Sequence, residues 1–418
     1  MVTFHLLLMH VLSLVLPRTY SFALAEDLEL EARMLPCDLI KYFGYPCDIT
    51  YATTEDGYIL EVYRIAHGIQ EGTSGTARQE NDQTRRRPPV LLVPSLLAGV
   101  DVYFLNLPSQ SPGFLFADNG FDVWAMSVRE NKPYVRHRTL SQDEPEFWQF
   151  SFDEIGRYDV AAAIDHVLNA TGARKLTVLG FSQGTLTNFI LQSTRPEYSE
   201  KVSLFIGYGP VGNITHIKPP VKLVMPYVPT LMASSSKLVY PFTQAGFLGS
   251  THGLRELFTA ACTFLGSIPC DIGFVLTGTS SPEQLNKTRI PVYLGHFPIG
   301  TSVQNFLHFY QIYKAKNLVM YDHGEAENRR RYGQVTPPPY PLERIQIPIA
   351  LFSGQGDILA DTADVSDLAY RLGTNLVFHR IVPQPSFSHQ DFVNGNRAND
   401  FLHNTAIELA KKYLSQNP

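Results

Sequence analysis

The sequence has little charge, and this alone excludes several classes of protein. Asp, Glu, Lys and Arg make up 17% of its 418 residues, whereas an average soluble domain has roughly 25%. Disordered chains combine low hydrophobicity with high charge, but 44% of this chain is apolar. It also lacks the glycine period of collagen and the sustained heptads of a coiled coil. The composition therefore predicts a globular protein with a large core.

Clustered positive charge is also scarce. The formal net charge is −5, and no basic run is longer than the three residues of Arg85-Arg86-Arg87. Nucleic-acid-binding proteins usually present a concentrated basic surface, so we expect no nucleic acid partner. Beyond the N-terminal segment there is no run of about 18 uninterrupted apolar residues, so we expect no transmembrane span.

The N-terminal segment predicts export. Leu6 to Leu16 form an apolar run, and Ala23-Leu24-Ala25 has the small-x-small pattern at which signal peptides are cleaved. We therefore expect residues 1–25 to be a signal peptide that is removed after Ala25. The alternative is an uncleaved anchor, although the apolar run is shorter than the roughly 20 residues that span a bilayer. Export predicts a secreted or lysosomal protein.

Cysteine is rare, and its use agrees with export. An oxidising compartment favours disulfides, and four cysteines can pair in three ways. We expect two local bridges, Cys37–Cys47 and Cys262–Cys270, with four buried free thiols as the alternative. The spacing does not match a zinc site, so no structural metal is expected. Three sequons predict glycosylation at Asn169, Asn213 and Asn286.

Short apolar runs alternate with helical patterns along the chain. Asp56-Gly57 is a hairpin signal that precedes an alternating strand over 58–63. Helical patterns cover 151–169 and 185–193, and apolar runs typical of buried parallel strands lie at 90–93, 121–126, 175–179, 204–208 and 347–352. This alternation predicts an α/β fold, with a mostly parallel sheet between layers of helices.

One stretch breaks this rhythm. Residues from about 211 to about 291 are rich in proline and apolar side chains, and we interpret them as an insertion that caps the sheet. Its apolar side chains would then either cover a functional site or complete the core.

A G-x-S-x-G motif predicts a nucleophile. Gly180-Phe181-Ser182-Gln183-Gly184 follows an apolar strand and begins a helical segment. A strained strand-to-helix turn exposes the serine hydroxyl in α/β-hydrolases, and the flanking glycines permit close backbone approach. We therefore expect Ser182 to be the nucleophile; a structural turn is the alternative.

The acid and the base should follow the serine in chain order. Asp357 lies on a glycine-rich turn after the strand predicted at 347–352, and Asp361 is a nearby competitor that we expect to cap a helix. His389 lies in a loop after a further strand, 376–382. We expect Asp357 and His389 to complete the triad. His296, His308 and His323 lie before Asp357 in the chain, so they violate this order.

An oxyanion needs two backbone N–H donors. One is expected from Gln183, the residue after the nucleophile, and the other from the loop after the strand at 90–93. Pro94 has no N–H, so we expect Leu96 to donate, with Ser95 as the second choice.

Further segments complete a recognisable set. They are Thr54-Glu55-Asp56-Gly57-Tyr58-Ile59-Leu60, Glu146-Phe147-Trp148, Phe150-Ser151-Phe152-Asp153-Glu154, Gly300-Thr301-Ser302-Val303-Gln304-Asn305, Asp357-Ile358-Leu359-Ala360-Asp361 and Ser388-His389-Gln390-Asp391-Phe392. Together with the serine motif they resemble the acid lipase family, the group of gastric lipase and lysosomal acid lipase. The resemblance extends from about residue 35 to about residue 412.

The resemblance implies an α/β-hydrolase with a cap and lid that hydrolyses esters of neutral lipids. Part of the segment at about 211–291 is then expected to cover Ser182 and to open at a lipid surface. The family's triad falls on Ser182, Asp357 and His389, and its oxyanion donors on Leu96 and Gln183. Its cysteine pair around the cap resembles Cys262 and Cys270. Two positions depart from the family pattern: Pro94-Ser95 stand where it usually has His-Gly, and Glu130 stands where it has Gly.

We therefore predict a serine esterase that acts on neutral lipid esters at a lipid–water interface, without a metal or organic cofactor. Two alternatives remain: a hydrolase for short soluble esters, and a hydrolase-fold protein that binds lipid without catalysis.

Overall fold

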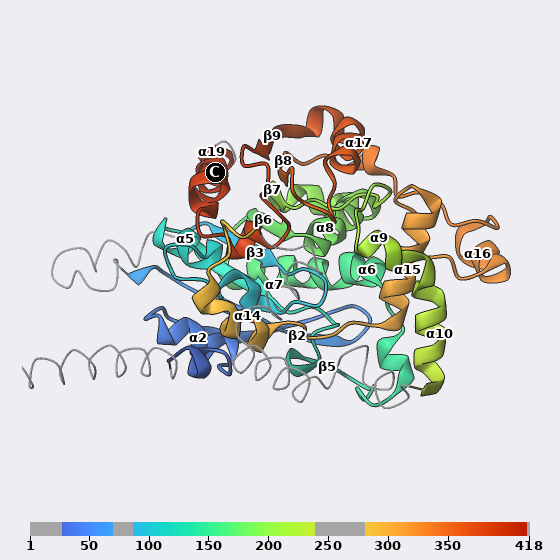
Figure 1. Cartoon of the computed structure of the whole chain (residues 1–418), viewed down its shortest axis with the longest axis horizontal. Coiled ribbons are helices and arrows are strands. Elements are labelled where there is room, and N and C mark those ends of the chain that lie inside the picture. The colour runs from blue at the N-terminus through green and yellow to red at the C-terminus, as the bar shows by residue number, and fades with distance from the viewer. Residues whose placement is uncertain (1–26, 70–86, 239–280, 416–418) are drawn as a thin grey trace, which may run out of the picture.

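The computed structural model describes residues 27–69, 87–238 and 281–415 (Figure 1). The predicted signal peptide, the predicted Cys262–Cys270 bridge and residues 239–280 of the predicted cap lie outside these ranges. Within them, no helix is long and apolar enough to cross a bilayer.

A twisted sheet forms the centre of the molecule. Its strand order is β1-β2-β4-β3-β6-β7-β8-β9, with β5 paired to β2. The first pairings, β1–β2 and β2–β4, are antiparallel, and all pairings from β4–β3 to β8–β9 are parallel. The strands are β1 (Asp48–Thr53), β2 (Tyr58–Ile65), β3 (Pro89–Val93), β4 (Asp122–Met126), β5 (Val135–His137), β6 (Leu176–Phe181), β7 (Val202–Tyr208), β8 (Ile349–Gly354) and β9 (Leu376–Val382).

Every residue of the five central parallel strands β3, β4, β6, β7 and β8 is buried. Strands covered on both faces have no solvent side, so their sequences are continuous apolar runs rather than alternating ones. The predicted α/β class and mostly parallel sheet are therefore confirmed, with strand ends displaced by one or two residues.

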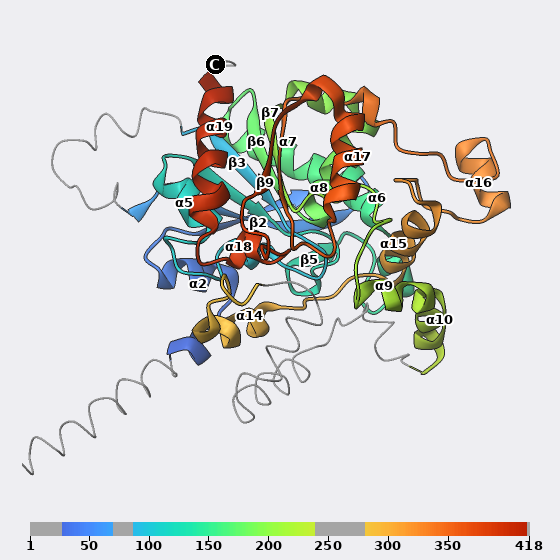
Figure 2. The same ribbon diagram turned by 45° about the horizontal axis from the view of Figure 1, so that its top comes forward.

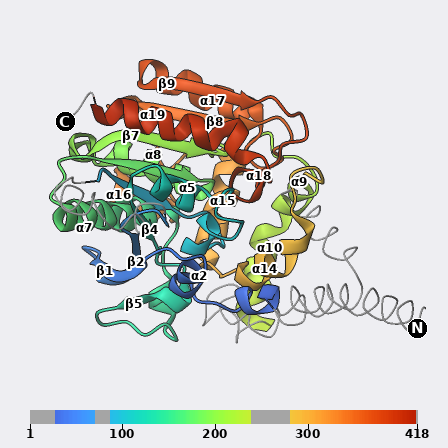
Figure 3. The same cartoon turned by 90° about the vertical axis from the view of Figure 1, so that its left-hand side faces the viewer.

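Helices cover both faces of the sheet (Figures 1 and 3). α5 (Pro112–Asp118) and α19 (Asn404–Ser415) pack on one face, and their apolar residues share a core cluster. α7 (Ala161–Thr171), α8 (Gln183–Thr194) and α17 (Thr362–Leu372) contribute to the cluster on the other. The predicted helix at 151–169 is divided: α6 (Phe152–Glu154) leads through a π-helical turn into α7.

The chain leaves the sheet after β7 and returns only at β8. The described part of this segment contains α9 (Val221–Val224), α10 (Val228–Leu238), α14 (Ile290–His296), α15 (Val303–Ala315) and α16 (Glu325–Tyr332). Figure 2 shows α9, α10 and α14 along the lower side of the molecule, and in Figure 3 they lie on the same side as α18 (Asp391–Asn394), which follows His389. Proline residues stand at the starts of its short helical pieces, as at Pro226 and Pro229.

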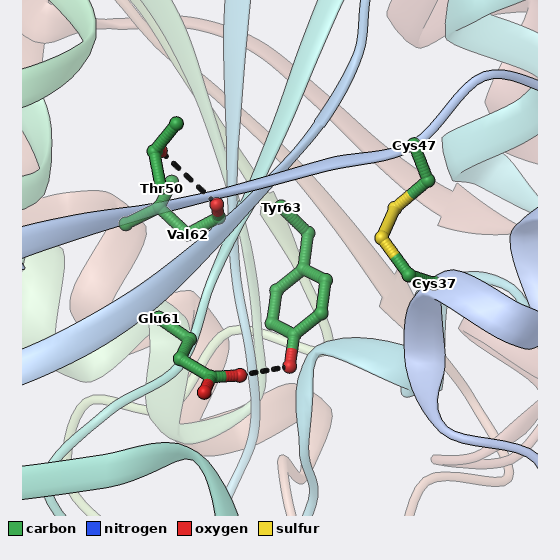
Figure 4. The surroundings of a disulfide bond; sticks show 6 residues. All are labelled: Cys37, Cys47, Thr50, Glu61, Val62 and Tyr63. Carbon is green, nitrogen blue, oxygen red and sulfur yellow. Dashed lines mark hydrogen bonds between the residues drawn. A yellow bond between two sulfur atoms is a disulfide. The ribbon is translucent and has the colours of Figure 1, made fainter.

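One predicted disulfide is present. Cys37 in α2 (Pro36–Tyr42) is bonded to Cys47, just before β1, with their Cα atoms 5.4 Å apart. Figure 4 shows the bridge beside β2, where the hydroxyl of Tyr63 donates to Glu61. Both sulfur-bearing residues are buried, so the bridge fastens α2 to the edge of the sheet.

Candidate active site

Ser182 occupies a sharp turn between β6 and α8. Its backbone angles are φ 54° and ψ −117°, a conformation that costs a non-glycine residue about 1–3 kcal/mol. The two glycines of the motif allow this turn. A Cβ atom at Gly180 would lie 2.5 Å from the carbonyl oxygen of Gly184, and one at Gly184 would lie 2.3 Å from that of Val93.

Hydrogen bonds to its backbone hold the strained serine in place. Its N–H donates to the carbonyl oxygen of Tyr208 at the end of β7 (2.9 Å). Its own carbonyl oxygen accepts from the N–H of Thr185 (2.8 Å) and from the hydroxyl of Thr185 (2.7 Å). Ser182 itself is only half-buried. The strained turn is therefore held by the end of β7 and by the first turn of α8, while the serine stays partly exposed.

The structure brings Asp357 and His389 together at the carboxyl ends of β8 and β9. Oδ2 of Asp357 lies 2.7 Å from Nδ1 of His389, and both side chains are buried. The other oxygen, Oδ1, accepts from the N–H groups of Leu359 and Ala360, each at 2.9 Å. The carboxylate is thus fixed by the backbone on one side and faces the imidazole with the other.

Asp361 takes the structural role expected of it. Its side chain accepts from the N–H of Ala363 at the start of α17 and forms an ion pair with Lys218 at 2.8 Å. The other histidines are occupied elsewhere. His296 binds Asp101 and the carbonyl of Glu31, and His308 lies between Ser151 and the carbonyl of Val319.

The imidazole of His389 packs against the residues that flank Ser182 and follow β7. The ring of Phe181 lies 5.0 Å from it, centroid to centroid. A Cβ atom at Gly209 would lie 3.1 Å from Cε1 of His389, so a side chain there would press on the ring. Nε2 is buried and has no hydrogen-bond partner among the described residues. With Nδ1 held by Asp357, this nitrogen is the one left for a substrate or for a nucleophile.

The two expected oxyanion donors lie at adjacent backbone segments. Gln183 is the first residue of α8, so its N–H has no acceptor within the helix. The carbonyl oxygens of Val93 and Pro94 lie close against Gly184 in the first turn of the same helix. Leu96 follows in a turn and is half-buried, and Leu97 has a positive φ of 61°. The loop after β3 therefore runs beside the N-terminus of α8, where partial positive charge accumulates.

Two acidic side chains near this site were not given a role by sequence reasoning. Glu130 is fully buried beside the side chain of Gln183, and burial raises its pKa to about 8. Asp391 accepts from the N–H groups of Ser388 (2.7 Å) and Ser281 (3.0 Å), and burial raises its pKa to about 7. Glu130 is one of the departures from the family pattern, and Asp391 lies in one of the segments that resemble the family. The sequence therefore draws attention to both positions, but only the folded chain shows what these side chains contact.

Among the described residues there is no cluster of three or more His, Cys, Asp and Glu side chains that could hold a metal ion.

The sequons differ in accessibility. Asn169 is exposed and Asn286 is half-buried, whereas Asn213 is buried and its Nδ2 donates to Asp367 (3.1 Å).

Comparison with known sequences agrees with this geometry. Residues 88–384 match the family described as "alpha/beta hydrolase fold", and residues 37–107 match the "Partial alpha/beta-hydrolase lipase region". Gastric triacylglycerol lipase of Bos taurus is 37% identical over 91% of this chain and 91% of its own. Lipase member K and lysosomal acid lipase/cholesteryl ester hydrolase, both of Homo sapiens, are each 36% identical over 92% of both chains. The chain therefore belongs to the acid lipase family of α/β-hydrolases.

Proposed function

We propose that this carboxylic ester hydrolase is a serine lipase that cleaves the ester bonds of neutral lipids, with Ser182, Asp357 and His389 as its catalytic triad. The observation that carries the proposal is the buried Asp357–His389 pair beside a strained, half-buried serine. A triad of this kind is recognised by geometry and by the roles of its members.

In the proposed reaction, Nε2 of His389 accepts the hydroxyl proton of Ser182 as Oγ attacks the ester carbonyl. Asp357 fixes the tautomer in which Nδ1 carries the proton, and its charge stabilises the imidazolium that forms. His389 then gives the proton to the leaving alcohol, and an acyl-enzyme remains. Water, deprotonated by the same nitrogen, releases the fatty acid.

The oxyanion of each tetrahedral intermediate is proposed to accept from the backbone N–H groups of Gln183 and Leu96. Donors of this kind are fixed by the fold before the reaction, so they lose little energy in reorganisation when the charge develops. Removal of one such donor costs roughly 2.7–4 kcal/mol of transition-state stabilisation in serine hydrolases.

The substrate class is proposed from the relatives and from the cap. Gastric triacylglycerol lipase and lysosomal acid lipase/cholesteryl ester hydrolase are named for neutral lipid esters. In this chain, α9, α10 and the 3-10 turn between them expose apolar side chains, including Leu223, Tyr227 and Leu231. Exposed apolar patches often mark interaction surfaces, which fits contact with a lipid–water interface. The cap is proposed to include the insertion at about 211–291.

Export is proposed from the signal-peptide pattern at 1–25 and from relatives that are gastric and lysosomal enzymes by name. A secreted or lysosomal destination also agrees with the Cys37–Cys47 bridge. We propose glycosylation first at Asn169 and Asn286. At Asn213 a glycan would have to displace the contact with Asp367.

A fluorophosphonate probe tests the proposal directly. The purified protein is expected to be labelled at Ser182, and to lose label and ester hydrolysis together in Ser182→Ala. Hydrolysis of emulsified long-chain triacylglycerol would support a lipase, while cleavage of short soluble esters alone would favour a simple esterase. A protein that binds lipid but neither reacts with the probe nor hydrolyses any ester would be a non-catalytic binder.

A further inference from the structure

A buried polar network surrounds the side chain of Gln183, and Glu130 lies at its centre. Nε2 of Gln183 donates to Oε1 of Glu130 (2.9 Å). Oε2 of Glu130 accepts from the hydroxyl of Thr301 (2.5 Å) and from Nδ2 of Asn305 (3.2 Å). Nδ2 of Asn305 also donates to Oε1 of Gln183 (2.8 Å), which closes the network. All four side chains are at most 1% exposed.

The network joins three parts of the chain that are far apart in sequence. Gln183 begins α8, Asn305 lies in the first turn of α15, and Glu130 lies in the loop after β4. The amide of Asn305 is itself fixed, because its Oδ1 accepts from the N–H of Phe152 (2.8 Å). Gln183 is therefore held through its side chain from outside its own helix.

The loop that carries Glu130 is anchored by its neighbours. Arg129 is buried between Asp56 and Asp159, with nitrogen–oxygen distances of 2.7 Å to each. The N–H of Val128 donates to Asn131, whose Nδ2 donates in turn to the carbonyl of Ala98 in the loop after β3. The same short loop thus contacts both segments that are proposed to supply oxyanion donors.

Glu130 has no cationic partner in the ion pairs that the described residues form. Of the charged groups near it, Arg129 is bound to two other carboxylates, and Asp159 raises the pKa of Glu130 further. The groups that face it from α8, from α15 and from the residues just before α15 are uncharged. A hydroxyl both donates and accepts, so Thr301 serves a protonated carboxyl as well as an ionised one.

We propose that Glu130, in its neutral form, is a positioning residue for the oxyanion site. It holds Gln183 so that the backbone N–H of that residue points at the developing negative charge. The inference rests on the proposed function of Gln183 as an oxyanion donor. Two consequences follow from it. Loss of the carboxyl should loosen the donor, and ionisation of the carboxyl should place a buried negative charge beside the site where an oxyanion forms.

Glutamine is the variant that separates these two consequences. In Glu130→Gln the amide oxygen still accepts from Gln183, and the new NH₂ group can donate to Thr301. Nδ2 of Asn305 loses its acceptor on residue 130 in this variant. It has only two hydrogens, however, and the other two acceptors within reach, on Gln183 and Thr301, remain. The variant therefore copies the protonated carboxyl and cannot ionise.

The test measures kcat and KM on soluble p-nitrophenyl butyrate from about pH 5 to about pH 9, at the wavelength where nitrophenol and nitrophenolate absorb equally. Glu130→Ala is expected to lower kcat about 10- to 100-fold, with KM within about twofold of wild type, because the lost interaction acts on the transition state. The kcat of wild type should fall as the pH rises through about 8. Glu130→Gln should keep kcat within about threefold below that pH and should lose the fall.

Controls separate this inference from the proposed function. Glu154→Gln is the matched control. Burial raises the pKa of the Glu154 carboxyl too, but this side chain caps α6 by binding Ser151. The pH profile of kcat for Glu154→Gln should therefore follow that of wild type. If Ser182→Ala retains hydrolysis, the proposed function fails. If Ser182→Ala is inactive but Glu130→Gln keeps the alkaline fall, the inference alone is overturned. The comparison of Glu130→Gln with wild type tests the inference even if Glu130→Ala does not fold. A folded Glu130→Ala with the kcat of wild type would also overturn the inference.

Discussion

The carboxylate of Asp357 is fixed to the imidazole of His389 by a 2.7 Å contact between Oδ2 and Nδ1. The second oxygen of Asp357 has no freedom to exchange places with the first, because Oδ1 already accepts from two backbone N–H groups. One oxygen is committed to the backbone and the other to the histidine. Replacement of the oxygen that faces His389 by an NH₂ group should therefore change the tautomer of the imidazole.

Asp357→Asn should therefore fold but lose about 10⁴ in kcat. The amide oxygen will stay with the N–H groups of Leu359 and Ala360, which leaves the NH₂ group facing Nδ1 and favours the wrong tautomer of His389. Turnover of a soluble ester measures the loss. The control is Asp361→Asn, four residues on, which caps α17. Asparagine keeps an oxygen that caps α17 and loses only the ion pair with Lys218, so the variant should cost at most about 1 kcal/mol of stability with kcat nearly unchanged. The reverse result would mean that the acid is misassigned.

Ser182→Ala should abolish hydrolysis while the free energy of unfolding stays within about 1 kcal/mol of wild type. Alanine must adopt the same positive φ, and the bonds that hold residue 182 involve only its backbone. Urea denaturation and an ester assay on the same preparation check both parts. Normal turnover in this variant would remove Ser182 from the mechanism.

The parallel strands and the turn at Ser182 were predictable because each depends on residues that are close together in the sequence. A strand that is buried on both faces must be apolar throughout, and the turn at Ser182 needs small residues on either side. Chain order and position after a strand were enough to predict that Asp357 and His389 would meet, and the structure pairs them. Asp361 was predicted to be a helix cap, and it caps α17.

What the sequence could not predict are contacts between distant segments. Nothing local to Glu130 indicates Gln183, Thr301 and Asn305, which come from other parts of the chain. The π-helical turn within the expected helix at 151–169 was also missed. There Gly156 packs so closely on α8 that a Cβ atom would lie 2.7 Å from the carbonyl oxygen of Thr187, and helical periodicity alone does not report such an approach.

Loss of the Cys37–Cys47 bridge should weaken the protein without removing its activity. The chain between the two cysteines is short, and closing such a loop contributes about 2–3 kcal/mol in the chain-entropy model. A Cys37→Ser/Cys47→Ser double variant should lose about that much stability in urea denaturation, with its kcat on a soluble ester unchanged. Mass spectrometry that finds both thiols free in the exported wild type would contradict this prediction.

The buried carboxyl of Asp391 should make stability depend on pH. Its pKa is raised from 3.8 to about 7 by burial, so the folded state favours the neutral form. The stability that this group contributes is complete below about pH 4 and is lost as the pH rises to about 7, by a few kcal/mol at about 1.4 kcal/mol per pKa unit. Asp391→Asn keeps an oxygen for Ser388 and Ser281 but does not titrate.

The difference in free energy of unfolding between wild type and Asp391→Asn should therefore shift in favour of the variant as the pH rises from about 4 to about 7. Urea denaturation at several pH values measures it. A difference that does not change with pH would show that Asp391 has an ordinary pKa in the folded protein.

The two faces of the cap helices should respond differently to a charge. Met225, Val228 and Met232 are buried and belong to a core cluster, whereas Tyr227 and Leu231 are 64% and 49% exposed. The buried face packs in the core, as the alternative interpretation of this segment proposed for all of its apolar residues. The exposed face costs about 25 cal/mol per Å² of apolar surface in water, a cost that contact with lipid would offset.

Leu231→Asp should therefore reduce hydrolysis of an emulsified long-chain triacylglycerol about tenfold or more, because it removes apolar contact area and places a charge at the lipid surface. Hydrolysis of soluble p-nitrophenyl butyrate should stay within about twofold, since the side chain has no part in the chemistry. Tyr370→Asp is the matched control: Tyr370 is 87% exposed on α17, and its loss should leave both rates unchanged. Equal losses on both substrates for Leu231→Asp, with a lowered melting temperature, would assign Leu231 to the core instead. Unchanged rates on both would mean that this face of α10 does not meet the lipid.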